Sequence, residues 1–87
     1  MRVEEINGRF LLCGGMIPNS SIKPGQTWAP ADGSKRSITI ESVKEDWVKY
    51  SWDQDNEYKT HQKLCFAFQC RYCLVLPTKS IPEEFDV

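Results

Sequence analysis

Two neighbouring runs in which apolar and polar residues alternate constrain the fold more than any other feature of this sequence. The runs are SITIESV, residues 37–43, and WVKYSW, residues 47–52, and the polar segment 44–46 separates them. Alternation with a period of two is typical of a strand with one buried face, and β-branched and aromatic residues favour strands. So short a polar connection predicts an antiparallel hairpin, and therefore a mainly β fold.

Weaker signals on either side of this hairpin complete the expected architecture. Residues 14–26 are rich in glycine and proline, which indicates a loop, and a first strand is expected over residues 26–29. After the hairpin, the sequence predicts a short strand over residues 58–61, a helical turn near residues 62–69 and a last strand over residues 71–76. One long strand through residues 64–76 is the alternative to this helical turn. The prediction is a small antiparallel β protein with a short helical turn before its last strand.

The length of 87 residues is that of one domain, because domains rarely contain fewer than about 50 residues. The core of this domain, residues 1–87, is expected at about residues 24–76. The N-terminal segment 1–23 and the C-terminal tail 77–87 are expected to be peripheral.

The cysteines bear on the compartment in which the chain is expected to act. There are four of them, Cys13, Cys65, Cys70 and Cys73. An even number of cysteines in a short chain indicates disulfides when the protein is secreted, but Glu4 and Glu5 lie where a signal peptide needs positive charge. No stretch reaches the roughly 20 apolar residues that span a bilayer. We therefore expect a cytoplasmic protein, in the host cell cytosol, with reduced thiols and no membrane partner.

A zinc site is the metal centre that the cysteine spacing allows. The potential ligands are His61, Cys65, Cys70 and Cys73. Structural zinc commonly takes its four nitrogen or sulfur ligands from two separated pairs, and only Cys70 and Cys73 form such a pair here. In a strand these two side chains point to opposite faces, which opposes shared ligation. Buried thiols without a cofactor are the main interpretation, and a zinc-stabilised interaction module is an alternative.

His61 and Cys65 also have the spacing that places two side chains on one face of a helix. A catalytic cysteine needs a neighbouring base and a group that orients it. The sequence supplies neither an oxyanion hole nor a cleft beside this pair. We therefore predict no catalytic residues and a protein that is not an enzyme.

The tryptophans favour a binding surface, since three of them exceed what a core of this size needs. In the run 47–52, Trp47 and Lys49 lie on the face opposite to Val48 and Tyr50, so burial of Val48 exposes Trp47. Exposed aromatic side chains ringed by mixed charges are typical of protein-binding hot spots. The predicted partner-binding residues are Trp47, Lys49, Trp28, Lys44 and Asp46. Packing of Trp47 over the end of the fold, or under the N-terminal segment, is the alternative.

Basic residues interleave with these tryptophans, a pattern that proteins use to bind single-stranded nucleic acid. The basic residues are Lys35, Arg36, Lys44, Lys49, Lys59 and Lys63. Acidic residues are threaded through the same hairpins, and the formal net charge of the chain is −1. These carboxylates cancel much of the field that attracts phosphate groups. Nucleic-acid binding is therefore an alternative prediction and not the leading one.

One longer pattern joins these elements: a Pro-Gly-Gln-x-Trp start, an Asp-Gly turn, a Val-x-Tyr strand and a final aromatic strand. Its residues are Pro24, Gly25, Gln26, Trp28, Asp32, Gly33, Val48, Tyr50, Phe68, Tyr72, Leu74 and Val75. The pattern, over about residues 24–76, resembles small phage and prophage proteins with an SH3-like barrel. The resemblance implies an antiparallel SH3-like barrel of phage origin. Such a barrel leaves a strand edge that can pair with another chain, so a homodimer is an additional prediction.

The leading functional prediction combines this origin with the small size, the near-neutral charge and the aromatic surface. It is a non-enzymatic phage accessory protein that binds and modulates, by inhibition, a host protein such as a defence or transcription component. The alternatives are a nucleic-acid-binding SH3-like barrel and a zinc-stabilised interaction module.

Overall fold

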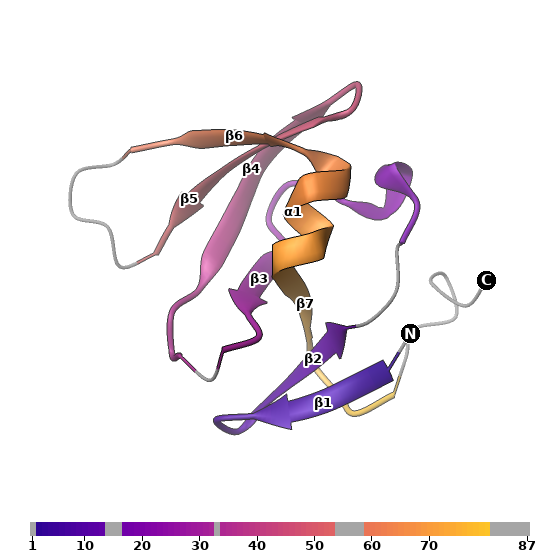
Figure 1. Cartoon of the computed structure of the whole chain (residues 1–87), viewed down its shortest axis with the longest axis vertical. Coiled ribbons are helices and arrows are strands. Elements are labelled where there is room, and N and C mark those ends of the chain that lie inside the picture. Colours follow the sequence, from indigo (N-terminus) through magenta and orange to yellow (C-terminus); the bar gives the residue numbers. More distant parts are fainter. Residues whose placement is uncertain (1, 14–16, 33, 54–58, 81–87) are drawn as a thin grey trace.

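Strands dominate the computed structural model, which describes residues 2–13, 17–32, 34–53 and 59–80 (Figure 1). In chain order its elements are β1 (Arg2–Ile6), β2 (Arg9–Cys13), the 3-10 helix η1 (Asn19–Ser21), β3 (Thr27–Pro30), β4 (Ile38–Lys44), β5 (Trp47–Trp52), β6 (His61–Leu64), α1 (Cys65–Arg71) and β7 (Tyr72–Leu76). The mainly β fold with a short helix before the last strand is confirmed.

The seven strands of the described residues form one antiparallel sheet with the order β1-β2-β7-β3-β4-β5-β6. Figure 1 shows β4, β5 and β6 at one end of the sheet and the β1–β2 hairpin at the other, with α1 between them. Within the part of the chain that is described, β1 and β6 are the two edge strands.

The predicted central hairpin is confirmed as β4 and β5. Val43 pairs with Val48 and Lys44 pairs with Trp47, and a bulge interrupts the register between Ile40 and Ser42. As the alternation predicts, Val48 and Tyr50 are buried and Trp47 is exposed. The strand expected over residues 26–29 is present as β3, with Pro30 as its last residue.

The expectation that residues 1–23 are peripheral is wrong. β2 lies between β1 and β7, and its Leu11 is fully buried. The β1–β2 hairpin turns at Asn7 and Gly8, whose φ angles are 53° and 78°. Asn-Gly is the preferred sequence for a two-residue hairpin turn, because both positions require positive φ. β2 is thus part of the core and not peripheral to it.

The boundaries near the end of the chain also differ from those predicted. A strand, β6, occupies His61–Leu64, and the helix begins only at Cys65. The short strand expected over residues 58–61 therefore starts at His61, and Tyr58 lies outside the described residues. α1 packs Cys65 and Phe68 into the core, and this burial favours a helix two to three residues later than the expected one. Of the expected tail, residues 77–80 are exposed bends.

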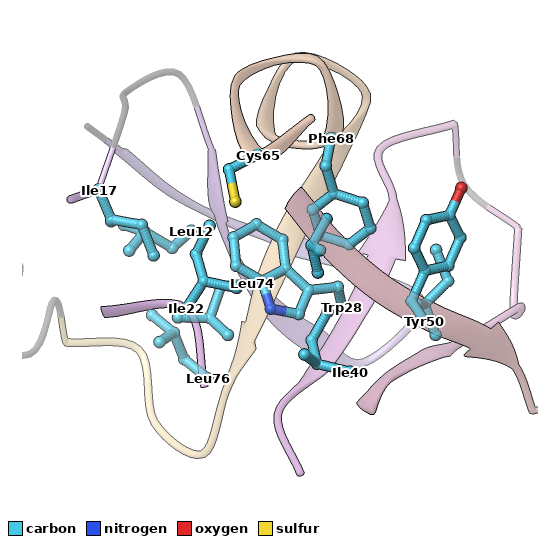
Figure 2. Packing of buried hydrophobic residues seen from close by; sticks show 12 residues of the cluster. Leu12, Ile17, Ile22, Trp28, Ile40, Tyr50, Cys65, Phe68, Leu74 and Leu76 are labelled. Atoms are coloured by element: carbon cyan, nitrogen blue, oxygen red, sulfur yellow. The ribbon is translucent and has the colours of Figure 1, made fainter. Parts of the chain in front are cut away.

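The main core joins the sheet to α1 (Figure 2). Figure 2 shows the Phe68 side chain reaching from the helix toward Trp28, and the two rings meet edge to face with centroids 5.0 Å apart. Tyr50 packs against Phe68 from β5, with a centroid distance of 5.0 Å. Aromatic pairs in such geometries add to the stability that burial of their area provides. Phe68 is therefore the central side chain of the core.

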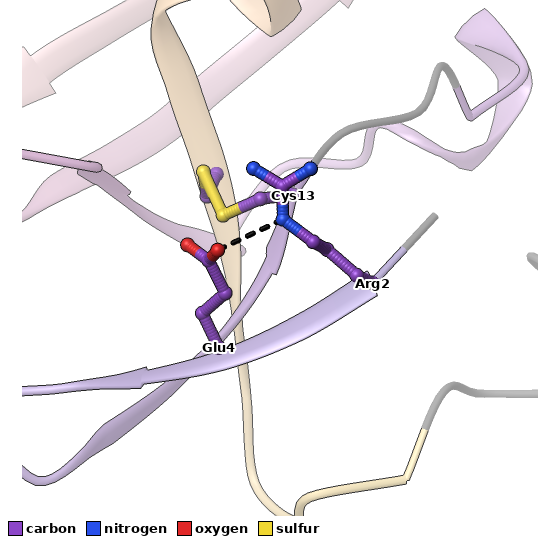
Figure 3. Close-up of a disulfide and its surroundings, with 4 residues drawn as sticks. Arg2, Glu4 and Cys13 are labelled. Carbon is purple, nitrogen blue, oxygen red and sulfur yellow. Dashed lines mark hydrogen bonds and ion pairs between the residues drawn. A yellow bond between two sulfur atoms is a disulfide. The ribbon is translucent and has the colours of Figure 1, made fainter.

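Cys13 and Cys73 form a disulfide between β2 and β7, with Cα atoms 5.2 Å apart (Figure 3). The prediction that all thiols are reduced is wrong for these two residues. Figure 3 shows an ion pair between two residues of β1, Arg2 and Glu4, beside Cys13. Cys65 and Cys70 are free thiols, the first buried and the second exposed. No helix of the described chain has the length and apolarity needed to cross a membrane.

Candidate functional site

The outer face of the β4–β5–β6 strands brings together most of the residues predicted to bind a partner. Register pairing places Lys44 beside Trp47, and Trp47 beside Leu64, in one row across the three strands. The next row consists of Ser42, Lys49 and Gln62. Five residues of these rows, together with Val48, line a shallow hollow of about 240 Å³: Ser42, Lys44, Trp47, Lys49 and Gln62. The alternation of β5 causes this arrangement, because Val48 and Tyr50 on the opposite face occupy the core.

Three large apolar side chains are exposed at one end of this face. Trp47 is 49% exposed, Leu64 45% and Phe66 68%. Trp47 begins β5, Leu64 ends β6 and Phe66 lies in the first turn of α1. Cys65, between Leu64 and Phe66, is fully buried, so its neighbours on both sides point outward. We call the surface formed by Lys44, Trp47, Lys49, Leu64 and Phe66 the Trp47 face.

Asp46, a further predicted site residue, belongs to the turn that holds the Trp47 face in place. Its backbone oxygen accepts a hydrogen bond of 2.7 Å from the Cys65 amide, which joins the β4–β5 turn to the start of α1. Its carboxylate accepts a bond of 3.2 Å from the Asn19 side chain. Burial raises the pKa of the Cys65 thiol, and the Asp46 carboxylate adds to this effect. Asp46 therefore acts as a support for this face, and Cys65 remains a protonated core residue.

Trp28, by contrast, is not available to a partner. Its side chain is only 2% exposed and belongs to the main core. Its indole N–H donates to Gln26 Oε1 at 3.2 Å, which satisfies the one polar atom of the side chain. The prediction of Trp28 as a binding residue is wrong, because its side chain points from β3 into the core and packs against Phe68.

The three tryptophans also do not form one stacking surface. Trp47 lies on the outer face of β5, whereas Trp52 has the opposite parity and packs edge to face on Tyr72 at 5.7 Å. With Trp28 in the core, each indole has a different environment. The predicted nucleic-acid surface that combines all three with the lysines is therefore not assembled.

The predicted zinc ligands are likewise separated. Cys73 is bonded to Cys13, and Cys70 is exposed at the end of α1. The His61 ring stacks on Tyr50 with centroids 5.6 Å apart. The described residues contain no group of three or more histidine, cysteine, aspartate or glutamate side chains placed to hold a metal ion. The zinc-stabilised alternative is wrong for this set of residues, because the disulfide removes one of its donors.

Leu64 and Phe66 were not among the predicted binding residues. The signal is present, since the segment Leu64-Cys65-Phe66 alternates around a buried cysteine as a strand does. Treating residues 62–69 as one helical turn conceals it, because the helix begins one residue after Leu64.

No protein-family model, curated protein or solved structure matches this chain. The surfaces of the molecule, and above all the Trp47 face, are therefore the main indication of its function.

Proposed function

We propose that this chain is a small non-enzymatic accessory protein of a phage that binds a host protein through the Trp47 face and inhibits it. The phage origin is carried over from the sequence resemblance, and the host cytosol is the proposed place of action. The single observation that supports binding is the exposure of Trp47, Leu64 and Phe66 at one end of a regular strand surface.

The apolar part of the Trp47 face supports a protein partner over a small ligand. Exposed apolar side chains that cluster are a common mark of protein interaction sites, whereas single ones are ordinary. Among the described residues, these three are the large apolar side chains that are exposed, and they gather within the β5–β6–α1 corner. The hollow beside them is shallow, and a shallow apolar surface suits a partner's protruding side chains better than an enclosed ligand.

The charged part of the face favours an acidic partner segment. Lys44 and Lys49 lie in the two rows that contain Trp47, while the Asp46 carboxylate is held by Asn19 at the turn. Charge complementarity raises association rates and excludes wrong partners. We therefore expect the host protein to present apolar side chains flanked by aspartate or glutamate.

A pull-down with the tagged chain tests this proposal, using the wild type, Trp47→Ala, Phe66→Ser and the control Lys79→Ala. Lys79 is exposed and lies outside the Trp47 face. Mass spectrometry then identifies the host proteins that the wild type and the control retain and the two face variants lose. With the purified partner, Trp47→Ala should weaken affinity about 30-fold or more, the equivalent of about 2 kcal/mol.

Circular dichroism of each variant verifies that the fold is retained, as expected for exposed positions. Unchanged affinity in both Trp47→Ala and Phe66→Ser would refute the Trp47 face as the binding site. Lys44→Glu should slow association in low salt, and Lys79→Glu should not. Sedimentation of the chain alone tests whether a second copy, and not a host protein, covers the Trp47 face. A dimer that Trp47→Ala dissociates would assign the face to self-association.

A further inference from the structure

A second concave surface lies away from the rows of the Trp47 face and has a different chemistry. It is an open groove of about 400 Å³ where the ends of β3, β5 and α1 meet the start of β7. Its principal lining residues are Pro30, Asp32, Arg36, Trp52, Arg71 and Tyr72. Aromatic rings and guanidinium groups therefore predominate in it.

The aromatic wall of this groove is fixed by the core. Trp52 meets Tyr72 edge to face, with centroids 5.7 Å apart and ring planes at 82°. Tyr72 in turn packs on Phe68, with centroids 4.9 Å apart. Both Trp52 and Tyr72 are half-buried, so each presents part of its ring to the groove. A rigid aromatic wall costs little conformational entropy when a flat ligand stacks on it.

A guanidinium group already lies on this wall. The Arg36 Cζ atom is 3.9 Å from the centroid of the Trp52 ring, which is the geometry of a cation–π contact. The stacked guanidinium is itself a flat platform, and nucleobases stack on arginine planes as well as on aromatic rings. The loop that carries Arg36 is fastened by Arg9, whose guanidinium donates to the Ser34 and Arg36 carbonyl oxygens.

Positive charge collects around the groove although the whole chain has a net charge of −1. Arg36 and Arg71 line it from opposite segments, and the Arg71 guanidinium forms no hydrogen bond or ion pair within the described part of the chain. The one carboxylate in the lining is Asp32, which accepts the Ser34 amide hydrogen at 2.9 Å. This bond lowers the pKa of Asp32, with a smaller contribution from Arg36. The groove therefore retains an excess of guanidinium charge for an anion.

We propose that this groove binds a nucleoside phosphate, either as a free nucleotide or as a unit of a single-stranded nucleic acid. The base stacks on the Arg36–Trp52 pair, and the phosphate pairs with the guanidinium of Arg71. Guanidinium groups bind phosphate through charge-assisted hydrogen bonds, which are stronger than neutral ones. An acidic peptide could pair with the guanidinium groups of the groove, but it has no flat ring to stack on the aromatic wall. A nucleoside phosphate provides both a negative charge and a flat base, and therefore matches both features of the groove.

The proposal is tested with adenosine monophosphate and with fluorescein-labelled oligo(dT), on the full chain in about 50 mM salt, where phosphate contacts are strong. Tryptophan fluorescence follows the nucleotide and anisotropy follows the strand. The variants are Arg36→Gln and Arg71→Gln, and Lys79→Gln is the matched control outside the groove. We expect saturable binding, weakened about fivefold or more by each arginine variant and unchanged by the control.

The two arms separate the sources of the ligand. Tighter binding of oligo(dT), with a steeper dependence on salt, assigns the groove to single strands, and tighter binding of the mononucleotide assigns it to free nucleotides. Absence of saturation by both probes overturns the proposal. Arginine variants that bind as the control does, or inorganic phosphate or a polyaspartate peptide that displaces the nucleotide at equal concentration, overturn it as well. Circular dichroism verifies that these exposed substitutions leave the fold intact.

Discussion

Trp28 and Phe68 meet edge to face, with ring centroids 5.0 Å apart and ring planes at 63°. The first ring comes from β3 and the second from α1, so this contact joins the sheet to α1. Both side chains are almost completely buried. The stability of the whole fold should therefore respond strongly to either residue.

Substitution Phe68→Ala should lower the free energy of unfolding by about 3–5 kcal/mol, because it removes a fully buried ring and leaves a cavity. Chemical denaturation followed by tryptophan fluorescence measures the loss. The matched control is Phe66→Ala on the same helix, since Phe66 is 68% exposed and its removal should change stability by about 0.5 kcal/mol or less. If Phe68→Ala unfolds the chain, Phe68→Leu should give a smaller, measurable loss. Equal losses at positions 66 and 68 would contradict the burial of Phe68 in the core.

Substitution Gln26→Ala should destabilise the protein by about 1–3 kcal/mol, because it leaves the buried Trp28 N–H without its acceptor. The same side chain accepts the Lys23 amide hydrogen at 3.0 Å and donates to the Ser21 carbonyl at 2.8 Å. Thermal unfolding measures the loss, with Gln62→Ala on β6 as an exposed control of identical chemistry. Equal thermal unfolding midpoints for the two variants would show that the hydrogen bonds of Gln26 to Ser21, Lys23 and Trp28 do not stabilise the fold.

Reduction of the Cys13–Cys73 disulfide should lower stability by about 4 kcal/mol, since the bond closes a loop with a sequence separation of 60 residues. Denaturation with and without a phosphine reductant measures the effect. Alkylation of the denatured chain should label only Cys65 and Cys70 before reduction, and all four cysteines after it. Complete labelling without reductant would contradict the disulfide. Because cytosolic thiols are usually reduced, alkylation inside cells also tests the proposed place of action.

Stability should fall as pH rises from about 10 to about 12, because burial, and secondarily Tyr72, raises the pKa of Tyr50 from 10.0 to about 12. In this window the folded state keeps the phenol proton that the unfolded chain has lost, and the state with more protons is disfavoured by rising pH. The stabilisation that Tyr50 provides is therefore fully present below about pH 10 and is lost as the pH rises to about 12. Tyr50→Phe should have a shallower slope than the wild type in denaturation at several pH values. Identical slopes would show that Tyr50 titrates normally.

The central hairpin was predictable because its signal is local. Residues 38–52 carry their own alternation, and the inward positions Val48 and Tyr50 follow from it directly. The outward Trp47, with Lys44 and Lys49 beside it, follows from the same alternation. Most of the candidate binding face could therefore be assigned without the structure.

The remaining features depend on contacts between distant segments. The disulfide requires β2 beside β7, and the burial of Trp28 requires α1 to lie over β3; no local pattern specifies either arrangement. The hairpin at Asn7 and Gly8 is different, because its Asn-Gly turn signal is local and present in the sequence, although residues 1–23 were predicted to be peripheral. The presence of two strands at residues 2–13 was therefore predictable from the sequence, whereas the pairing of β2 with β7 was not.

The position of β7 between β2 and β3 has a consequence for biosynthesis. Until residues 72–76 have left the ribosome, the β1–β2 hairpin and the β3–β6 strands have no strand to join them. The nascent chain therefore exposes two unpaired strand edges, on β2 and on β3, throughout the synthesis of the segments between. Such edges invite aggregation, and closure of long loops slows folding. This protein should thus depend on chaperones more than its small size suggests.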